Sequence, residues 1–227
     1  MKVAGKDRHR RRGFLRHILV ALLTVLWIGA VVYPDPRPFI NSLTRLGTPP
    51  VDGAAVTEIA ATLPDDYPTI EDFSLDYVKY QPAWTVYRLP WYFPTVDEVL
   101  RDHAGDCQAR AMLAASIFSA KGMSYTLRYS FDHVWVDYPG KNAPSMEDPA
   151  TSFVADSGGG WLAKLPEKIP LWTIIKVRLG YHWSPMPLIQ KILIVMGCLV
   201  IIGWGERAAW RRLGTSARAL VRRRSPA

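Results

Sequence analysis

Cysteine is scarce in this sequence: Cys107 and Cys198 are the only two among 227 residues. Cys198 stands inside a long apolar run, so the central part of the chain holds one thiol and cannot form a disulfide within itself. Paired Cys and His ligand spacings are missing as well, so the sequence predicts no zinc site, and we expect no metal and no cofactor. If Cys107 lies outside the cytoplasm, a lone exposed thiol there is open to oxidation. We therefore interpret Cys107 as a functional residue.

Acidic residues are almost absent from the two ends of the chain. Residues 1–17 and 205–227 each hold seven Lys or Arg against one acid, so each end carries +6 and the rest of the chain carries −4 of the net +8. A nucleic-acid-binding protein needs its basic surface on the fold itself. The distribution of charge therefore predicts no nucleic-acid partner.

Long apolar runs lie next to both basic ends. Residues 14–33 and 188–205 are about as long as the roughly 20 residues that a bilayer core requires. Lys191, the one charge in the second run, lies near its end, where its side chain can reach the headgroups. The positive-inside rule places both ends in the cytoplasm and the segment between the runs on the other side. We predict an integral protein of the inner (cytoplasmic) membrane, in contact with lipid, with a periplasmic or extracellular central domain.

Other interpretations of these runs stay open. A cleaved signal peptide needs a small-x-small site, which does not follow Ala30, so an uncleaved anchor is favoured. The Arg pair at residues 11–12 also resembles a twin-arginine export signal, which gives the same outside location. The second run is alternatively a buried helix of a soluble domain. Residues 161–187 alternate tryptophans and aliphatic residues with basic ones and predict an amphipathic segment at the membrane interface, or an extra helix packed on the domain.

A helix begins at the cysteine of the central region. Small and apolar residues follow Cys107 and predict a helix that ends near Lys121-Gly122. Cys107 is therefore expected at a helix N-terminus, where unpaired N–H groups and the macrodipole favour the thiolate and lower the thiol pKa from roughly 8.5 toward neutrality. The same N–H groups can hold a developing oxyanion.

Two strands are predicted after this helix, over residues 125–131 and 134–138, with His133 at the break between them. A cysteine at a helix end and a histidine on a strand are the two halves of a thiolate–imidazolium pair. Glu147-Asp148-Pro149 follows a predicted turn at residues 139–142, and a carboxylate there can accept the other imidazole N–H and fix the tautomer. The order of cysteine, histidine and acid is therefore present at close range.

These segments resemble a known family. Gly105-Asp106-Cys107, the Ala-rich helix, His133-Val134-Trp135-Val136 and Asp148-Pro149 are similar to the transglutaminase-like superfamily, in particular its bacterial transglutaminase-like cysteine proteinase branch, over roughly residues 52–160. The resemblance implies an α+β fold with a papain/transglutaminase-like core, in which the helix carrying the cysteine packs on a small antiparallel sheet, here flanked by two transmembrane helices. It also implies that Cys107 is the nucleophile, His133 the general base and Asp148 the orienting carboxylate, with Asp156 and Asp137 as alternatives for the third residue.

Upstream of the cysteine, short helices are predicted over residues 54–63 and from 69 or 70 to 80. Residues 81–94, rich in proline and aromatics, predict an irregular wall, and Thr95 with Glu98 forms a capping box. Gln81, Trp84 and Trp91 are candidates for the second oxyanion donor beside the Cys107 N–H, with simple aromatic packing as the alternative for the tryptophans. His103 is interpreted as a surface histidine in a turn.

The predicted function is acyl transfer through a thioester, by a cysteine peptidase or amidase or by a transglutaminase. The expected partners are a peptide or protein substrate and, in a membrane complex, other proteins. The alternative is a catalytically inactive subunit that acts as a scaffold in such a complex. The expected order along the chain is basic tail (1–13), first span (14–33), linker (34–51), extracytoplasmic domain (52–160), interface segment (161–187), second span (188–205) and basic tail (206–227).

Overall fold

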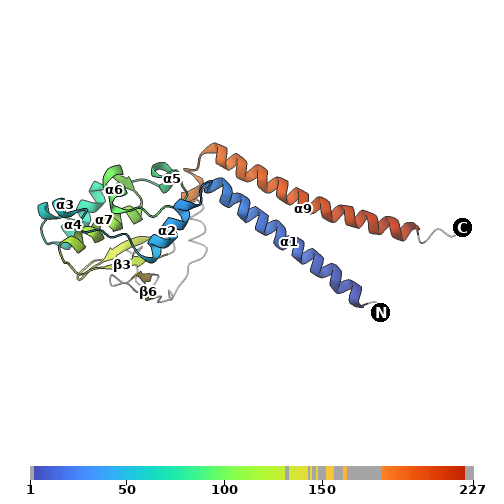
Figure 1. The fold of residues 1–227 in the computed structure, drawn as a ribbon, viewed down its shortest axis with the longest axis horizontal. Coiled ribbons are helices and arrows are strands. Elements are labelled where there is room, and N and C mark those ends of the chain that lie inside the picture. The colour runs from blue at the N-terminus through green and yellow to red at the C-terminus, as the bar shows by residue number, and fades with distance from the viewer. Residues whose placement is uncertain are drawn as a thin grey trace. The chain divides into compact units, whose positions relative to one another are not determined.

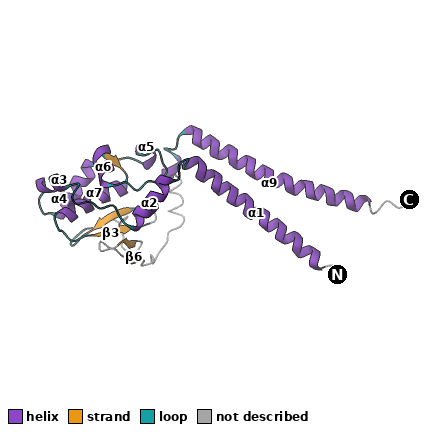
Figure 2. Ribbon diagram, viewed as in Figure 1, coloured by secondary structure: helices purple, strands orange, loops and turns teal. Residues whose placement is uncertain are grey.

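The structure, a computed structural model, combines helices with two small sheets (Figures 1 and 2). It describes residues 3–130, 133–142, 144, 147, 152–155, 161–162 and 180–222. The contacts divide the chain into two units, Pro36–Met186 and Met1–Asp35 with Pro187–Ala227. We describe each unit by itself. The expected mixture of helices with a small antiparallel sheet is present in the first of them.

Five helices precede the cysteine in the unit Pro36–Met186. They are α2 (Arg37–Gly47), α3 (Thr57–Thr62), α4 (Tyr67–Tyr77), α5 (Ala83–Val86) and α6 (Val96–Asp102). The capping box at α6 is confirmed: Thr95 Oγ1 accepts from the Glu98 N–H, and the Glu98 carboxylate accepts from the Thr95 N–H at 2.8 Å. His103 ends α6 in the left-handed conformation, with a φ of 47°.

Helix α7 (Cys107–Ala120) is the centre of this unit. Ten of its fourteen residues are buried, so it has no polar face, and α3, α4, α6 and strand β4 all contact it. Alanines along the helix let these neighbours approach closely, while Met112, Leu113 and Phe118 fill the core. The predicted helix is confirmed, including its end at Lys121-Gly122, where Gly122 has a φ of 65°.

The larger sheet is antiparallel throughout, with the strand order β4-β3-β5-β6. Its strands are β3 (Thr126–Tyr129), β4 (Val134–Asp137), β5 (Phe153–Ala155) and β6 (Trp161–Leu162). The first two strands follow the predicted pair, and β4 is the strand that packs on α7. The smaller sheet pairs β1 (Lys79–Tyr80) in parallel with β2 (Ala104–Gly105), which brings Tyr80 beside Gly105.

Residues 34–51 differ from the expected linker because most of them form α2. The helix is tied to the fold by Ser42, whose Oγ accepts from the Phe93 N–H at 3.0 Å, and by Arg45, whose Nη1 donates to Phe93 O at 2.7 Å. Both contacts join residues about fifty positions apart, so they could not be predicted from the local pattern of the sequence. Helix α5 likewise interrupts the region that was expected to be irregular.

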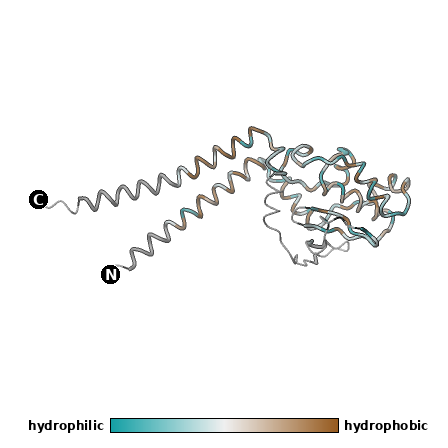
Figure 3. Tube along the Cα trace, turned by 180° about the vertical axis from the view of Figure 1, so that it is seen from behind, coloured by the Kyte–Doolittle hydropathy of each residue, from teal (hydrophilic) through white to brown (hydrophobic). Residues whose placement is uncertain are grey.

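The other unit is a pair of long helices, α1 (Val3–Val32) and α9 (Leu188–Arg222), which contact each other. Each contains a stretch long and apolar enough to cross a membrane, Gly13–Val32 and Leu188–Gly205. These stretches are brown in Figure 3, and most of their side chains are exposed. Trp27 Nε1 donates to Leu193 O at 2.9 Å, and a Cβ at Gly197 would overlap the Trp27 ring. Glycine therefore makes room for the indole at this crossing.

The expected interface segment lies mainly outside the described residues. Its first two residues form strand β6, paired with β5, and so belong to the sheet. Residues 163–179 are not among those described. At the end of the segment, Met186 is buried and Trp183 is 40% exposed.

Candidate active site

Cys107 is the first residue of α7, as the sequence predicts. Asp106 caps the helix, because its Oδ1 accepts from the Gln108 N–H at 3.0 Å. The turn into the helix requires glycine at residue 105, since a Cβ there would overlap the Cβ of Ala109. The Gln81 N–H donates to Gly105 O at 2.9 Å, which fixes this turn against the segment that follows β1. These contacts fix the backbone at Cys107. Cys107 forms no disulfide with Cys198.

His133 immediately precedes β4, at the tight end of the β3–β4 hairpin. The Ser130 N–H donates to His133 O at 2.8 Å, and the His133 N–H donates to Ser130 Oγ at 2.9 Å. The imidazole stacks on the Trp135 ring, with 5.7 Å between centroids and 16° between planes. Backbone and ring contacts together define where the imidazole can lie.

A single cavity of about 90 Å³ is lined by both Cys107 and His133. Its walls come from α4, from one face of α7 and from β4, with Tyr80 and Glu147 also on the lining. The predicted nucleophile and the predicted base therefore face the same small space, although 26 positions separate them in the chain.

The carboxylate next to His133 is that of Glu147. His133 Nε2 lies 3.4 Å from Glu147 Oε1, and Glu147 Oε2 lies 2.7 Å from Lys141 Nζ. Burial by itself would raise the pKa of Glu147, but hydrogen bonds from His133 and Lys141 and the charge of Lys141 outweigh burial and hold this pKa below its ordinary value. Glu147 is consequently an ionised acceptor at neutral pH.

Lys141 is the buried cation of the site, with only 3% of its side chain exposed. Its Nζ lies 2.7 Å from Glu71 Oε1 and donates to Val136 O, also at 2.7 Å. The Tyr138 hydroxyl donates to the other oxygen of Glu71 at 2.6 Å, and burial followed by this hydrogen bond raises the pKa of Tyr138. A buried ammonium needs charged partners. Lys141 finds one in α4 and one in the segment after β4.

The third residue predicted from the sequence was Asp148. In the structure the carboxylate of its neighbour Glu147 lies next to the imidazole, whereas Asp148 and Asp156 lie outside the described residues, so the predictions for these two stay predictions. Asp137 is engaged elsewhere, because its Oδ2 accepts from Arg128 Nε at 2.6 Å. The sequence did indicate a carboxylate in this triplet. No pattern of residues in the sequence, however, selects Glu147 within it.

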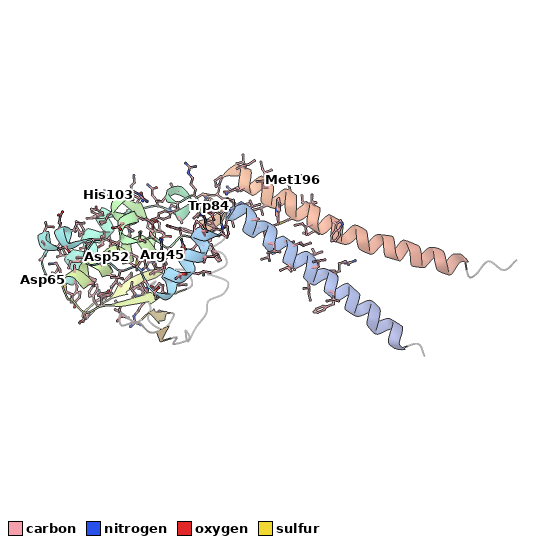
Figure 4. All side chains as sticks on the ribbon, in the orientation of Figure 1. Arg45, Asp52, Asp65, Trp84, His103 and Met196 are labelled. Atoms are coloured by element: carbon pink, nitrogen blue, oxygen red, sulfur yellow. The ribbon has the colours of Figure 1, made fainter. Side chains whose placement is uncertain are left out.

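The three oxyanion candidates are not on the cavity lining. Gln81 is held beside Gly105 through its backbone, and Trp84 on α5 is buried, with no hydrogen-bond partner for its Nε1 among the described residues. Trp91 packs edge-on against Phe39. Its Nε1 donates to the side-chain oxygen of Gln108 at 2.7 Å, and the amide nitrogen of Gln108 donates to Tyr92 O at 3.0 Å. Trp84 and His103 are labelled in Figure 4, and the ring of His103 packs at a tilt of 46° against Tyr77.

Tyr80 is a cavity residue that the sequence did not single out. Burial raises its pKa, the negative charge of the nearby Cys107 raises it further, and a hydrogen bond with Tyr181 lowers it. The parallel pairing of β1 with β2 brings it to the site. Each of these strands has only two residues, so hydrophobic periodicity in the sequence could not predict the pairing. Tyr80 is half exposed and so forms the rim of the cavity.

The arrangement contains a thiol at a helix N-terminus, an imidazole and a carboxylate next to the imidazole, which are the groups that acyl transfer through a covalent intermediate uses. Among the described residues, no three His, Cys, Asp or Glu side chains gather closely enough to hold a metal ion. Comparisons with protein-family models, with curated proteins and with solved structures find no match for this chain.

Proposed function

We propose that this protein is a membrane-anchored, cysteine-dependent acyl-transfer enzyme, a peptidase or amidase in which Cys107 is the nucleophile, His133 the general base and Glu147 the orienting carboxylate. The observation that carries the proposal is the common cavity of Cys107 and His133, with Glu147 3.4 Å behind the imidazole. The resemblance of residues 52–160 to the transglutaminase-like superfamily supports it from the sequence. A papain/transglutaminase-like core is part of the proposal, and the packing of α7 on the antiparallel sheet is consistent with it.

The chemistry follows from the order of these groups. Because Nε2 of His133 faces Glu147, Nδ1 is the nitrogen that exchanges a proton with the Cys107 thiol. The thiolate attacks the substrate carbonyl carbon, and the imidazolium gives its proton to the amine as the carbon–nitrogen bond breaks. A thioester remains on Cys107. Water then attacks the thioester, His133 removes its proton, and the acid product leaves as the thiol is restored. An amine in place of water would give transamidation.

The membrane part of the proposal rests on α1 and α9. Their apolar stretches and the basic residues beyond them support two spans, with both termini in the cytoplasm and the cavity outside it. The substrate would then be a peptide or protein of the cell envelope. Fusion of a reporter that is active in only one compartment to each terminus and to a loop of the unit Pro36–Met186 tests this topology.

The decisive experiment measures how fast Cys107 reacts with a small electrophile such as iodoacetamide in the full-length protein in detergent micelles. We expect rapid modification, slowed roughly 10²-fold or more by His133→Ala, because general acid–base assistance contributes about that much. His103→Ala is the matched control, since His103 follows the end of α6 and is not on the cavity lining, and it should leave the rate unchanged. Reaction of Cys107 at the same slow rate with and without His133 would favour an inactive scaffold subunit instead.

A further inference from the structure

The cavity continues from Cys107 along one face of α7. Cys107, Ala111, Ala114 and Phe118 are spaced by three or four positions, which places them on the same side of the helix. Both alanines are buried, with 5% and 4% exposure, and Phe118 is fully buried. The space exists because two consecutive turns of the helix carry methyl groups where leucine or methionine would fill it. Opposite lie Val134 and Val136 of β4.

The polar groups on the lining are engaged by the protein itself. Glu71 and Glu147 contact Lys141, and Ser74 Oγ donates to Ile70 O at 2.9 Å. The guanidinium of Arg110 donates to two backbone oxygens, those of Val78 and Leu75. The other described residues of the lining are mainly aliphatic or aromatic, and a charged group packed against them would lose its hydration, which is unfavourable. The walls are complementary to an uncharged, apolar group.

The size of the cavity limits that group further. At about 90 Å³ it is smaller than the roughly 150 Å³ apolar cavity that holds a benzene ring. An aliphatic group of about three or four carbons fits this space, whereas an aromatic ring or a long acyl chain exceeds it.

We propose that this cavity is a specificity pocket, which takes a short aliphatic side chain of the acyl donor and so places the neighbouring carbonyl at Cys107. Ala111 and Ala114 determine its depth. The inference rests on the proposed function, because it concerns the same site, and it names the substrate class: peptides or amides with a small aliphatic side chain close to the bond that is cleaved.

The test compares a series of chloroacetamides that share one electrophile and differ in the amide substituent: methyl, propyl, isobutyl, benzyl, carboxyethyl and dodecyl. The rate of Cys107 modification in the full-length protein is followed by mass spectrometry and divided by the rate of each probe with cysteine in solution. We expect propyl and isobutyl to react about tenfold faster than methyl, since burial of each CH2 contributes about 0.8 kcal/mol. Benzyl, carboxyethyl and dodecyl should give no such gain.

Three variants make the assignment specific. Ala114→Leu fills the pocket and should abolish the advantage of propyl and isobutyl over methyl. Ala120→Leu, the same change on an exposed position of α7, should leave the whole series unchanged. Ala114→Gly enlarges the pocket without adding atoms and should speed the benzyl probe, so it remains informative if the larger side chain at residue 114 prevents folding.

The outcomes separate the pocket from the chemistry. A flat series with rapid, His133-dependent modification overturns the pocket and leaves the proposed function standing. Fastest reaction of the dodecyl probe identifies a lipid-like acyl chain as the occupant and also overturns it, as does an unchanged preference in folded Ala114→Leu. Slow reaction of all probes, independent of His133, overturns both proposals.

Discussion

Two networks in the unit Pro36–Met186 use the same kinds of groups for different ends. In the first, Arg45 Nη1 contacts Tyr92 Oη, Phe93 O and Glu98 Oε2 at 2.7 to 3.2 Å, and the second oxygen of Glu98 accepts from Tyr92. In the second, Lys141 joins Glu71 to Glu147, and Glu147 continues to His133. Both contain a cation, a glutamate and a tyrosine.

The difference between them lies in where each network ends. The Arg45 network ends on the backbone of the α6 N-terminus, so its contacts fix α2 to α6. The Lys141 network ends on an imidazole that lines a cavity with Cys107. Hydrogen bonds and charge pairs therefore do not by themselves mark a functional site. The Lys141 network differs in that it leads to an imidazole that lines the same cavity as a thiol, which is why the proposal rests on it.

The largest effect on stability is expected from Lys141→Met. The change leaves Glu71 and Glu147 close together without their shared cation, and breaking a buried pair costs about 3–5 kcal/mol in the free energy of unfolding. Urea unfolding of the purified protein measures the change. Lys121→Met is the control, because the side chain of Lys121 is only 11% exposed but its partner Asp65 is 78% exposed, so that no buried carboxylate is left unpaired, and we expect a loss below about 1 kcal/mol. Equal losses in the two variants would contradict a special role of the buried lysine.

The difference in chemistry is tested by Glu147→Gln against Glu98→Gln. We expect Glu147→Gln to slow iodoacetamide modification of Cys107 roughly ten- to a hundredfold, because the neutral amide no longer stabilises the imidazolium. Glu98→Gln should leave this rate unchanged and lower the unfolding free energy instead, by about 1–3 kcal/mol. If both variants slowed the modification of Cys107 to the same extent, the proposed role of Glu147 beside His133 would be wrong.

Arg45→Met should affect stability alone. Its side chain is 22% exposed, and loss of its charge-assisted hydrogen bonds should lower the free energy of unfolding by about 1–3 kcal/mol. Thermal unfolding checks this, with Arg101→Met as control, since Arg101 is 67% exposed and its ion pair among the described residues is with the adjacent Asp102. The modification rate of Cys107 should match the unaltered protein; a slower rate would show that α2 also supports the site.

The smallest effect is expected from pH. Burial would raise the pKa of Glu147 and of Glu98, but hydrogen bonds and a nearby cation lower both below the ordinary value of 4.5. A carboxyl with a lowered folded-state pKa stabilises the fold fully above its unfolded value, and this contribution is lost as pH falls through the folded pKa. Unfolding free energy should therefore decline below about pH 4.5. In Glu147→Gln and in Glu98→Gln the unfolding free energy should fall less steeply with decreasing pH. An unchanged slope would contradict the lowered pKa of the replaced glutamate.

What could be predicted from the sequence was local. The helix from Cys107, the capping box at Thr95 and the β3–β4 pair depend on residues close together in the chain, and the structure contains all three. The two long apolar helices follow from length and hydropathy alone.

The remainder depends on contacts between distant positions. Helix α2 is held by Ser42 and Arg45 against residues near 93, and Tyr80 reaches the cavity through a two-residue strand pairing. Lys141 was part of a predicted turn, and only the approach of Glu71 from α4 turns it into a buried cation. The contact of Glu147 with His133 joins residues 14 positions apart, and no period in the sequence predicts it.

The bond from Trp27 to Leu193 spans 166 positions of the chain. Because translation proceeds from the amino end, the indole leaves the ribosome long before its acceptor has been made. The unit that carries Cys107 is therefore complete in sequence before the two long helices can join. The two helices can therefore pair only late in synthesis. A chain that ends before residue 193 lacks the acceptor of the Trp27 indole.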